Sequence, residues 1–180
     1  MQIDLNQTQT LVIDIQEKLY PHMYKKEEFL ENSIKLIQGL KLFNIPFTLN
    51  EQYPKGIGST ISPIKELLND EKIYEKITFS CCKTDNTMEH IKKLNKKFVI
   101  IFGIEAHVCV MQSVLDLLED GFIPVVITDC ISSRSSHNKD SSIQRMIQSG
   151  AIPATYESIL FELCVSAKNK VFKEISKIIK

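Results

Sequence analysis

The chain has 180 residues, of which 43% are hydrophobic and 24% charged, values typical of a soluble globular domain. This length suits one domain with a sizeable core and is short for two, so we expect a single domain over residues 1–180. The 22 Lys and Arg residues balance the 22 Asp and Glu residues, so the charge gives no indication of a nucleic-acid or membrane partner.

The N-terminal segment MQIDLNQTQT lacks the basic and apolar regions of a signal peptide, and no apolar run is long enough to span a membrane. The cysteines are odd in number and show no CxxC or other metal-ligand spacing. They are Cys81, Cys82, Cys109, Cys130 and Cys164. The four histidines form no HExxH or HxH pair. The sequence therefore predicts a cytoplasmic protein without disulfides, and it gives no support for a metal or other cofactor.

Short apolar runs of strand length alternate with longer amphipathic patterns along the chain. In chain order they predict strand 10–15, helix 27–43, strand 46–50, helix 61–68, a weaker strand 77–80, helix 86–94, strand 98–103, helix 105–118, strand 124–128, helix 139–148, strand 151–155 and two final helices at 158–164 and 170–179. Several strands are apolar throughout, as expected when both faces of a sheet are covered. The alternation predicts an α/β domain with a parallel sheet between two layers of helices.

Ligands in open α/β sheets bind outside the carboxyl ends of the strands, so the residues just past each strand are the candidates for a site. The stretch GIEAHVCV (103–110) lies between the apolar run FVIIFG and an amphipathic helix. Cys109 falls about one turn into that helix, where the dipole and free N–H groups favour a thiolate and can receive an oxyanion. The alternative is a small core residue, because free cysteines are usually buried.

Two charged residues also lie at strand ends. Asp14 ends the apolar run LVIDIQ, and a carboxylate there is costly unless it is paired or serves as a cap. Lys76 opens the predicted strand in YEKITFS, where a solvated lysine is the alternative. The P-loop, GxGxxG and GxSxG motifs are absent.

Taken together, LVIDIQEKL, EKITFSC, GIEAHVCV and ITDCISSRS resemble, in the same order, the isochorismatase-like (cysteine hydrolase) superfamily over nearly the whole chain. EQYPKGIG, SSRS and RMIQSGA further resemble its subgroup of isochorismatase domain-containing proteins. The resemblance implies a three-layer α/β/α Rossmann-like fold with a six-stranded parallel sheet in the order 3-2-1-4-5-6. It also implies a homo-oligomer of two or more chains.

The same resemblance implies a catalytic triad of Asp14, Lys76 and Cys109. It assigns the oxyanion hole to the backbone N–H groups of Glu105 and Cys109, and a cis peptide bond to Ile104–Glu105. In such a triad the aspartate moves the thiol proton, the lysine holds the charges in place, and the thiolate attacks a carbonyl to form a thioester.

The substrate is less well defined by the sequence. Gln16, Tyr53, Ile104 and Ala106 lie where a small-molecule substrate is expected to bind. The segment NEQY (50–53) lacks the Asp-x-His cluster of nicotinamidases, so a metal-dependent nicotinamidase is not predicted. The retained cysteine instead indicates attack on an amide or a related C–N bond.

Two other functions remain open at this level. The first is a non-catalytic binding or scaffold protein on the hydrolase fold. The second is a thiol redox sensor, because a cysteine of low pKa is also easily oxidised. The adjacent pair Cys81–Cys82 has no role in any of these readings.

Overall fold

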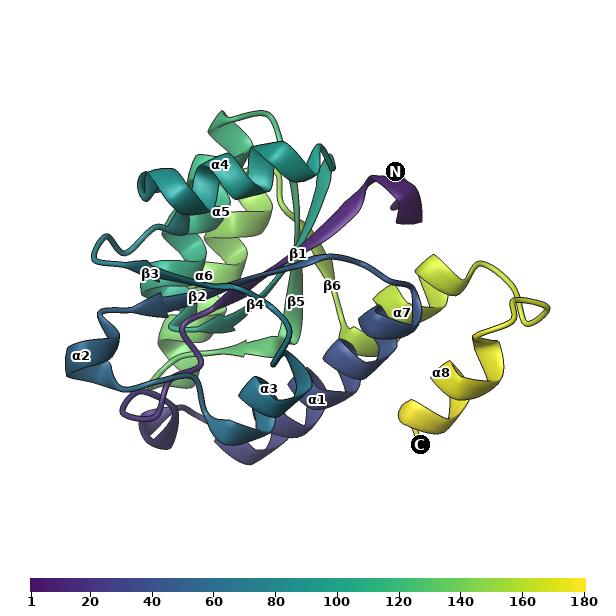
Figure 1. Ribbon diagram of the computed structural model, residues 1–180, viewed down its shortest axis with the longest axis horizontal. Coiled ribbons are helices and arrows are strands. Elements are labelled where there is room, and N and C mark those ends of the chain that lie inside the picture. Colours follow the sequence, from purple (N-terminus) through teal and green to yellow (C-terminus); the bar gives the residue numbers. More distant parts are fainter.

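The computed structural model describes residues 1–180 and is built around one six-stranded parallel sheet (Figure 1). The strand order is β3-β2-β1-β4-β5-β6, which confirms the predicted fold class. The strands are β1 Thr8–Ile13, β2 Phe47–Gln52, β3 Ile73–Lys76, β4 Phe98–Ile104, β5 Ile123–Ser132 and β6 Ile152–Ala154.

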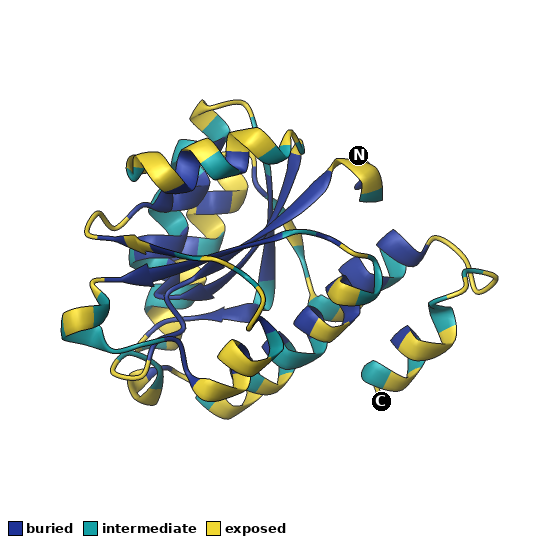
Figure 2. Cartoon of the chain, in the orientation of Figure 1, coloured by how far each residue is buried: buried dark blue, intermediate teal, exposed yellow.

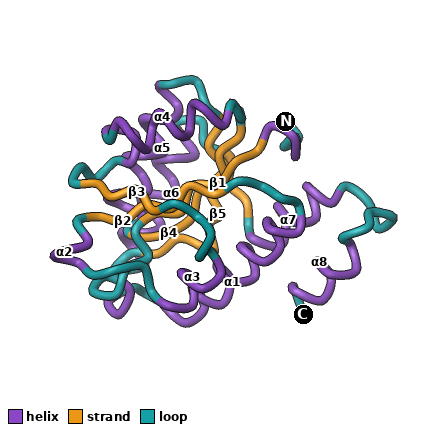
Figure 3. Tube along the Cα trace, in the orientation of Figure 1, coloured by secondary structure: helices purple, strands orange, loops and turns teal.

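Helices cover both faces of the sheet, as the ribbon and tube views show (Figures 1 and 3). The layer built on α1 Lys26–Leu42 also contains α3 Ser62–Leu67, α7 Tyr156–Cys164 and α8 Phe172–Ile178. The opposite layer contains α4 Asp85–Leu94, α5 Met111–Glu119 and α6 Ser136–Gln148. The short elements are α2 Pro54–Ile57, the 3₁₀ turns Leu5–Gln7, Tyr20–His22 and Cys81–Lys83, and the π-helical turn Ala106–Val110.

The core lies on both faces of the central strands. Every residue of β1, β2 and β4 is buried, whereas the outward faces of the helices are exposed (Figure 2). Covering on both faces explains why β4 reads as a continuous apolar run, whereas β1 and β2 also bury polar residues such as Gln9 and Asn50. No helix is both long and apolar enough to cross a membrane.

The third strand was predicted in the wrong place. It comprises Ile73–Lys76, and the predicted strand 77–80 is a loop in which Ile77 and Phe79 are 72% and 56% exposed. Because β3 is at the edge of the sheet, its sequence IYEK includes an exposed Glu75 and lacks the continuous apolar signal of the central strands. Lys76 therefore ends a strand rather than opening one, which places it at the carboxyl edge of the sheet.

Close approach of β1 and β4 fixes the geometry at that edge. Gly103 has φ +135° and pairs with Ile13, and a Cβ at Gly103 would collide with the Ile13 carbonyl oxygen. Only glycine meets both demands without strain. The chain segments that leave β1 at Asp14 and β4 at Glu105 are thereby held side by side.

Candidate active site

Asp14 and Lys76 form a buried ion pair across the end of β2. Asp14 directly follows β1 with φ 54°, a left-handed conformation that aspartate tolerates better than most residues. The Lys76 Nζ donates to Asp14 Oδ2 at 2.7 Å, and both side chains are fully buried. β2 separates β1 from β3, so the two residues meet only because three parallel strands end at the same edge.

Three further acceptors surround the Lys76 ammonium. Its Nζ lies 2.7 Å from Gln52 Oε1, 3.0 Å from the Phe79 carbonyl and 3.3 Å from the Thr78 carbonyl. The Gln52 amide is fixed in turn, because its Nε2 donates to the Ile77 carbonyl at 2.6 Å. The loop 77–80, exposed on its outer side, thus wraps the ammonium with carbonyl groups on its inner side.

The protonation of this pair follows from burial and mutual charge. Burial raises the pKa of Asp14, while the Lys76 ammonium opposes that rise. Burial acts to lower the pKa of Lys76, but the ionised forms of Cys81 and Asp14 more than offset it, so the Lys76 pKa is raised. Lys76 is therefore held as an ammonium, and its proton is not free for transfer near neutral pH.

Cys109 lies in the widened turn that follows β4. The N–H groups of Val108 and Val110 donate to the Glu105 carbonyl at 3.1 and 3.2 Å, whereas that of Cys109 does not. In an ordinary α-helix the Cys109 N–H would donate to the Glu105 carbonyl. The Glu105 N–H, next to the cis peptide bond at Ile104–Glu105, has no protein acceptor. The sequence predicted an α-helix here, and the π-helical turn is a correction to it.

Cys109 is buried, with 6% of the residue exposed. Burial first, and then the Asp14 carboxylate, raise its pKa to about 12, although Lys76 opposes them. The expectation of a resting thiolate at a helix start is therefore wrong, because burial and a neighbouring anion outweigh the favourable dipole. The second oxygen of the carboxylate, Asp14 Oδ1, is buried and has no hydrogen-bond partner.

The raised pKa makes a direct prediction for alkylation. The rate at which iodoacetamide modifies Cys109 should climb steadily with pH up to at least pH 10, because the thiolate fraction keeps growing while the pKa lies near 12. Mass spectrometry of the Cys109 peptide measures the rate. A free cysteine would level off near its ordinary pKa of about 8.5, and such a plateau would contradict the prediction.

Four residues were predicted to contact the substrate, and the structure gives them different environments. Gln16 is fully buried. Its Nε2 donates to the carbonyl groups of Gln52 and Gly58, and its Oε1 accepts the N–H of Gln52. The Gln16 amide is therefore engaged by the backbone on both its N–H and its C=O side. Ile104 and Ala106 are also fully buried. Tyr53 is half exposed.

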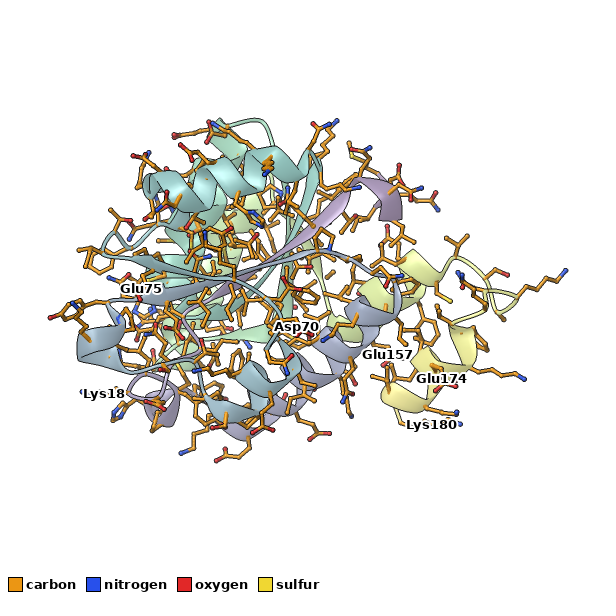
Figure 4. All side chains as sticks on the ribbon, in the orientation of Figure 1. Lys18, Asp70, Glu75, Glu157, Glu174 and Lys180 are labelled. Carbon is orange, nitrogen blue, oxygen red and sulfur yellow. The ribbon has the colours of Figure 1, made fainter.

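Two cavities open on this edge of the sheet. The first, of about 400 Å³, is lined by Tyr53, Pro54, Lys55, Glu75, Lys76, Ile77 and Thr84. Glu75, labelled in Figure 4, marks its position beside β3. The second, of about 500 Å³, is lined by Leu19, His22, Met23, Glu105 and Arg134. Lys76 borders the first cavity and Glu105 the second, whereas Asp14 and Cys109 line neither of them.

Sequence reasoning missed three side chains that hold the site. Gln52 orients Lys76, as described above, and Arg134 pairs with Glu105. The Ser113 hydroxyl accepts the Cys81 N–H at 2.9 Å and donates to the Cys109 carbonyl at 2.7 Å. Gln52 ends a strand and could have been found by the rule that selected Asp14, whereas Ser113 and Arg134 carry no signal of this kind.

No three His, Cys, Asp or Glu side chains gather as a metal site.

Comparison with known proteins identifies the family. The isochorismatase domain matches residues 8–158. The isochorismatase family protein 1A of Dictyostelium discoideum is 37% identical, over 94% of this chain and 84% of that protein. A solved structure of the MAR1 ribonuclease from Caenorhabditis elegans is 36% identical, covers 99% of this chain and 92% of that chain, and has a TM-score of 0.92.

More distant structures share the fold. The YcaC gene product of Escherichia coli, described as an octameric hydrolase of unknown specificity, has a TM-score of 0.94 at 24% identity and covers 99% of this chain and 89% of that chain. YcaC from Pseudomonas aeruginosa, solved with hexane-2,5-diol and covalent acrylamide, has a TM-score of 0.94 at 25% identity and covers 99% and 90%. From the domain match and the relatives above 30% identity, the chain belongs to the isochorismatase family, a family generally of hydrolases.

Proposed function

We propose that this protein is a cysteine-dependent hydrolase that cleaves an amide or related C–N bond of a small molecule. The observation that carries the proposal is the buried Lys76–Asp14 pair, which acts electrostatically on the Cys109 thiol beside the unbonded N–H of Glu105. A nucleophile, a base, a fixed cation and an amide donor are the parts that acyl transfer through a thioester requires.

In the first half of the reaction, Cys109 attacks the carbonyl carbon. Asp14 takes the thiol proton as the S–C bond forms, and the unpartnered Oδ1 is the oxygen available to accept it. The electron pair of the C=O bond moves onto oxygen, where the N–H groups of Glu105 and Cys109 receive it. When the tetrahedral intermediate collapses, the C–N bond breaks and the leaving amine takes the proton from Asp14, leaving a thioester.

In the second half, water replaces the amine. Asp14 accepts a proton from water as the oxygen attacks the thioester carbonyl, and the same two N–H groups hold the second oxyanion. The C–S bond then breaks, the acid product leaves, and the Asp14 proton returns to Cys109. Removing one oxyanion donor typically raises such a barrier by about 3–4 kcal/mol.

A thiol that rests protonated suits this sequence of steps. Because burial holds the Cys109 pKa near 12, the thiolate forms only as the proton moves to Asp14 during attack. Lys76 keeps its own proton and stabilises the anionic charge that moves between the carboxylate and sulfur. The same property disfavours a redox sensor, since oxidation needs a resting thiolate and burial raises the pKa of Cys81, Cys82 and Cys109 alike.

A small, uncharged substrate fits the site best. Lys76 is already committed to four acceptors and offers no free cation to a phosphate or carboxylate. Tyr53 and Ile77 give the adjoining cavity apolar surface. Acrylamide, covalently bound in the P. aeruginosa relative, is itself a small uncharged amide. The balanced charge of the chain also gives no basis for nucleic acid as a substrate.

Turnover of simple amides and ureides tests the proposal. The protein should release ammonia from at least one member of such a library, and intact mass should show an acyl adduct that is absent from Cys109→Ala. Cys164→Ala, which removes another buried cysteine, is the matched control and should keep both signals. A protein that forms no adduct and turns over no amide would instead be a binding protein on this fold.

We further propose that the protein forms homo-oligomers and resides in the cytoplasm. The E. coli relative is described as octameric, and the exposed Ile77 and Phe79 offer apolar surface for a contact between copies. The five cysteines are all free, as is usual in a reducing compartment.

A further inference from the structure

The segment SSRS (132–135) contains one arginine whose function the proposed chemistry leaves open. Its three serines each fix a different neighbour. The Ser132 hydroxyl donates to the Tyr24 carbonyl at 2.7 Å, Ser133 Oγ lies 2.9 Å from His107 Nδ1, and the Ser135 side chain caps α6. The loop is therefore held at both of its flanks, and Arg134 is presented from a fixed position.

Arg134 contacts the acidic side chain at the proposed oxyanion hole. Its Nε donates to Glu105 Oε1 at 2.5 Å and its Nη2 to Glu105 Oε2 at 3.2 Å, a two-point contact. The Glu105 side chain is only 9% exposed, whereas that of Arg134 is 66% exposed. No other cation pairs with Glu105. One guanidinium therefore compensates the charge of this carboxylate, and solvent contributes little because the side chain is nearly buried.

The Glu105 charge lies in an unfavourable place for the reaction. The backbone N–H of the same residue is a proposed oxyanion donor, so negative charge would develop close to a carboxylate. Two like charges repel strongly where water is scarce, and only a nearby cation can cancel that repulsion. An arginine suits this task because its planar fork matches a carboxylate and it stays charged at all relevant pH values.

We propose that Arg134 is a positioning residue for the proposed hydrolysis, because its guanidinium fixes the Glu105 carboxylate and neutralises it beside the oxyanion hole. The inference rests on the proposed function, and in particular on the Glu105 N–H as oxyanion donor. It predicts that loss of Arg134 harms steps that place negative charge on a carbonyl oxygen, and spares steps at Cys109 that do not.

Two small reagents separate these cases. When acrylamide adds to a thiol, the S–C bond forms and the C=C electron pair shifts to place negative charge on the amide oxygen. The proton released by the thiol is then transferred to the α-carbon. With iodoacetamide the S–C bond forms while the C–I bond breaks, the thiol proton is lost to solvent, and the negative charge leaves as iodide. Intact mass, with Cys109→Ala as the blank, gives both rates without a known substrate.

Arg134→Gln should slow acrylamide addition by about 10- to 100-fold, the size expected for one uncompensated charge a few ångströms away. Iodoacetamide alkylation should change by less than about 3-fold, which keeps it within the range of ordinary surface effects. The double variant Arg134→Gln/Glu105→Gln should recover most of the acrylamide rate, because the repelling charge is gone. Arg145→Gln, at the only other arginine and an exposed one, should match the wild type with both reagents.

Each remaining outcome counts against a specific claim. Equal acrylamide rates for Arg134→Gln and the wild type would overturn this inference alone. A double variant no faster than Arg134→Gln would show that Arg134 only supports the loop, and would also overturn it. A wild-type Cys109 that reacts with iodoacetamide but never with acrylamide would remove the oxyanion hole, and this inference with it. Reaction with neither reagent would overturn the proposed nucleophile.

Discussion

Asp14→Asn is expected to lower kcat/KM for any amide substrate by about 100- to 10,000-fold, the usual contribution of a positioned general base. An amide in place of the carboxylate cannot take the Cys109 proton or pass it to the leaving amine. Asparagine keeps the size of the side chain and tolerates the left-handed backbone at this position, where φ is 54°. Steady-state kinetics with a substrate found in the library measure the loss.

The same substitution should have the opposite effect on alkylation. The Asp14 charge helps to raise the pKa of Cys109, so its removal lowers that pKa and enlarges the thiolate fraction at neutral pH. Iodoacetamide should then modify Cys109 faster while hydrolysis fails. Asp70→Asn, at an exposed position labelled in Figure 4, should change neither rate. Hydrolysis and alkylation that decline together would show that Asp14 supports the structure instead of moving a proton.

The acid side of the wild-type pH profile belongs to the same prediction. Burial raises the pKa of Asp14 above its usual value, so acid converts the base to its inactive form at a higher pH than for an ordinary aspartate. Activity should therefore decline on acidification before the pH reaches about 3.9, the value for an exposed aspartate.

The fold could be predicted from the sequence because most strands are buried on both faces. The apolar runs within β1 and β4 could be recognised without knowledge of their partners, since a strand covered on both faces can be apolar along its length. The edge strand β3 gave no such signal, and the segment 77–80 resembled a strand only by residue type. Its β-branched and aromatic residues follow the strand and are largely exposed.

From the sequence, only those site residues could be predicted that lie at the end of a recognisable strand. Asp14 was selected because it ends a buried strand, and the resemblance to a family linked it to Lys76 and Cys109. Of the residues that hold these three in place, only Gln52 ends a strand, whereas Ser113 and Arg134 act through contacts between distant segments that the sequence does not reveal. Gln16 illustrates the limit, since a polar residue past a strand can serve the backbone as readily as a ligand.

Lys76→Met is expected to destabilise the protein by about 3–5 kcal/mol, the usual cost of leaving a buried charge without its partner. Lys76 is the only cation that pairs with the Asp14 carboxylate, and the Cys109 thiol and the Gln52 N–H beside it carry no compensating charge. Urea denaturation at neutral pH measures the change. Lys177→Met, which breaks an exposed ion pair with Glu174, should cost no more than about 1 kcal/mol.

The pH dependence of that loss identifies its cause. Without Lys76, the Asp14 pKa in the folded state lies even further above its unfolded value, so the folded protein binds more protons than the unfolded chain between the two pKa values. Stability should then fall as the pH rises from about 3.9, the unfolded value, through the raised folded one. The double variant Asp14→Asn/Lys76→Met removes both charges, so it should lose this slope and recover most of the free energy of unfolding. A double variant as unstable as Lys76→Met would mean that the ion pair contributes little. The lysine would then stabilise the fold by the packing of its methylene groups and by its hydrogen bonds to Gln52 and the loop 77–80.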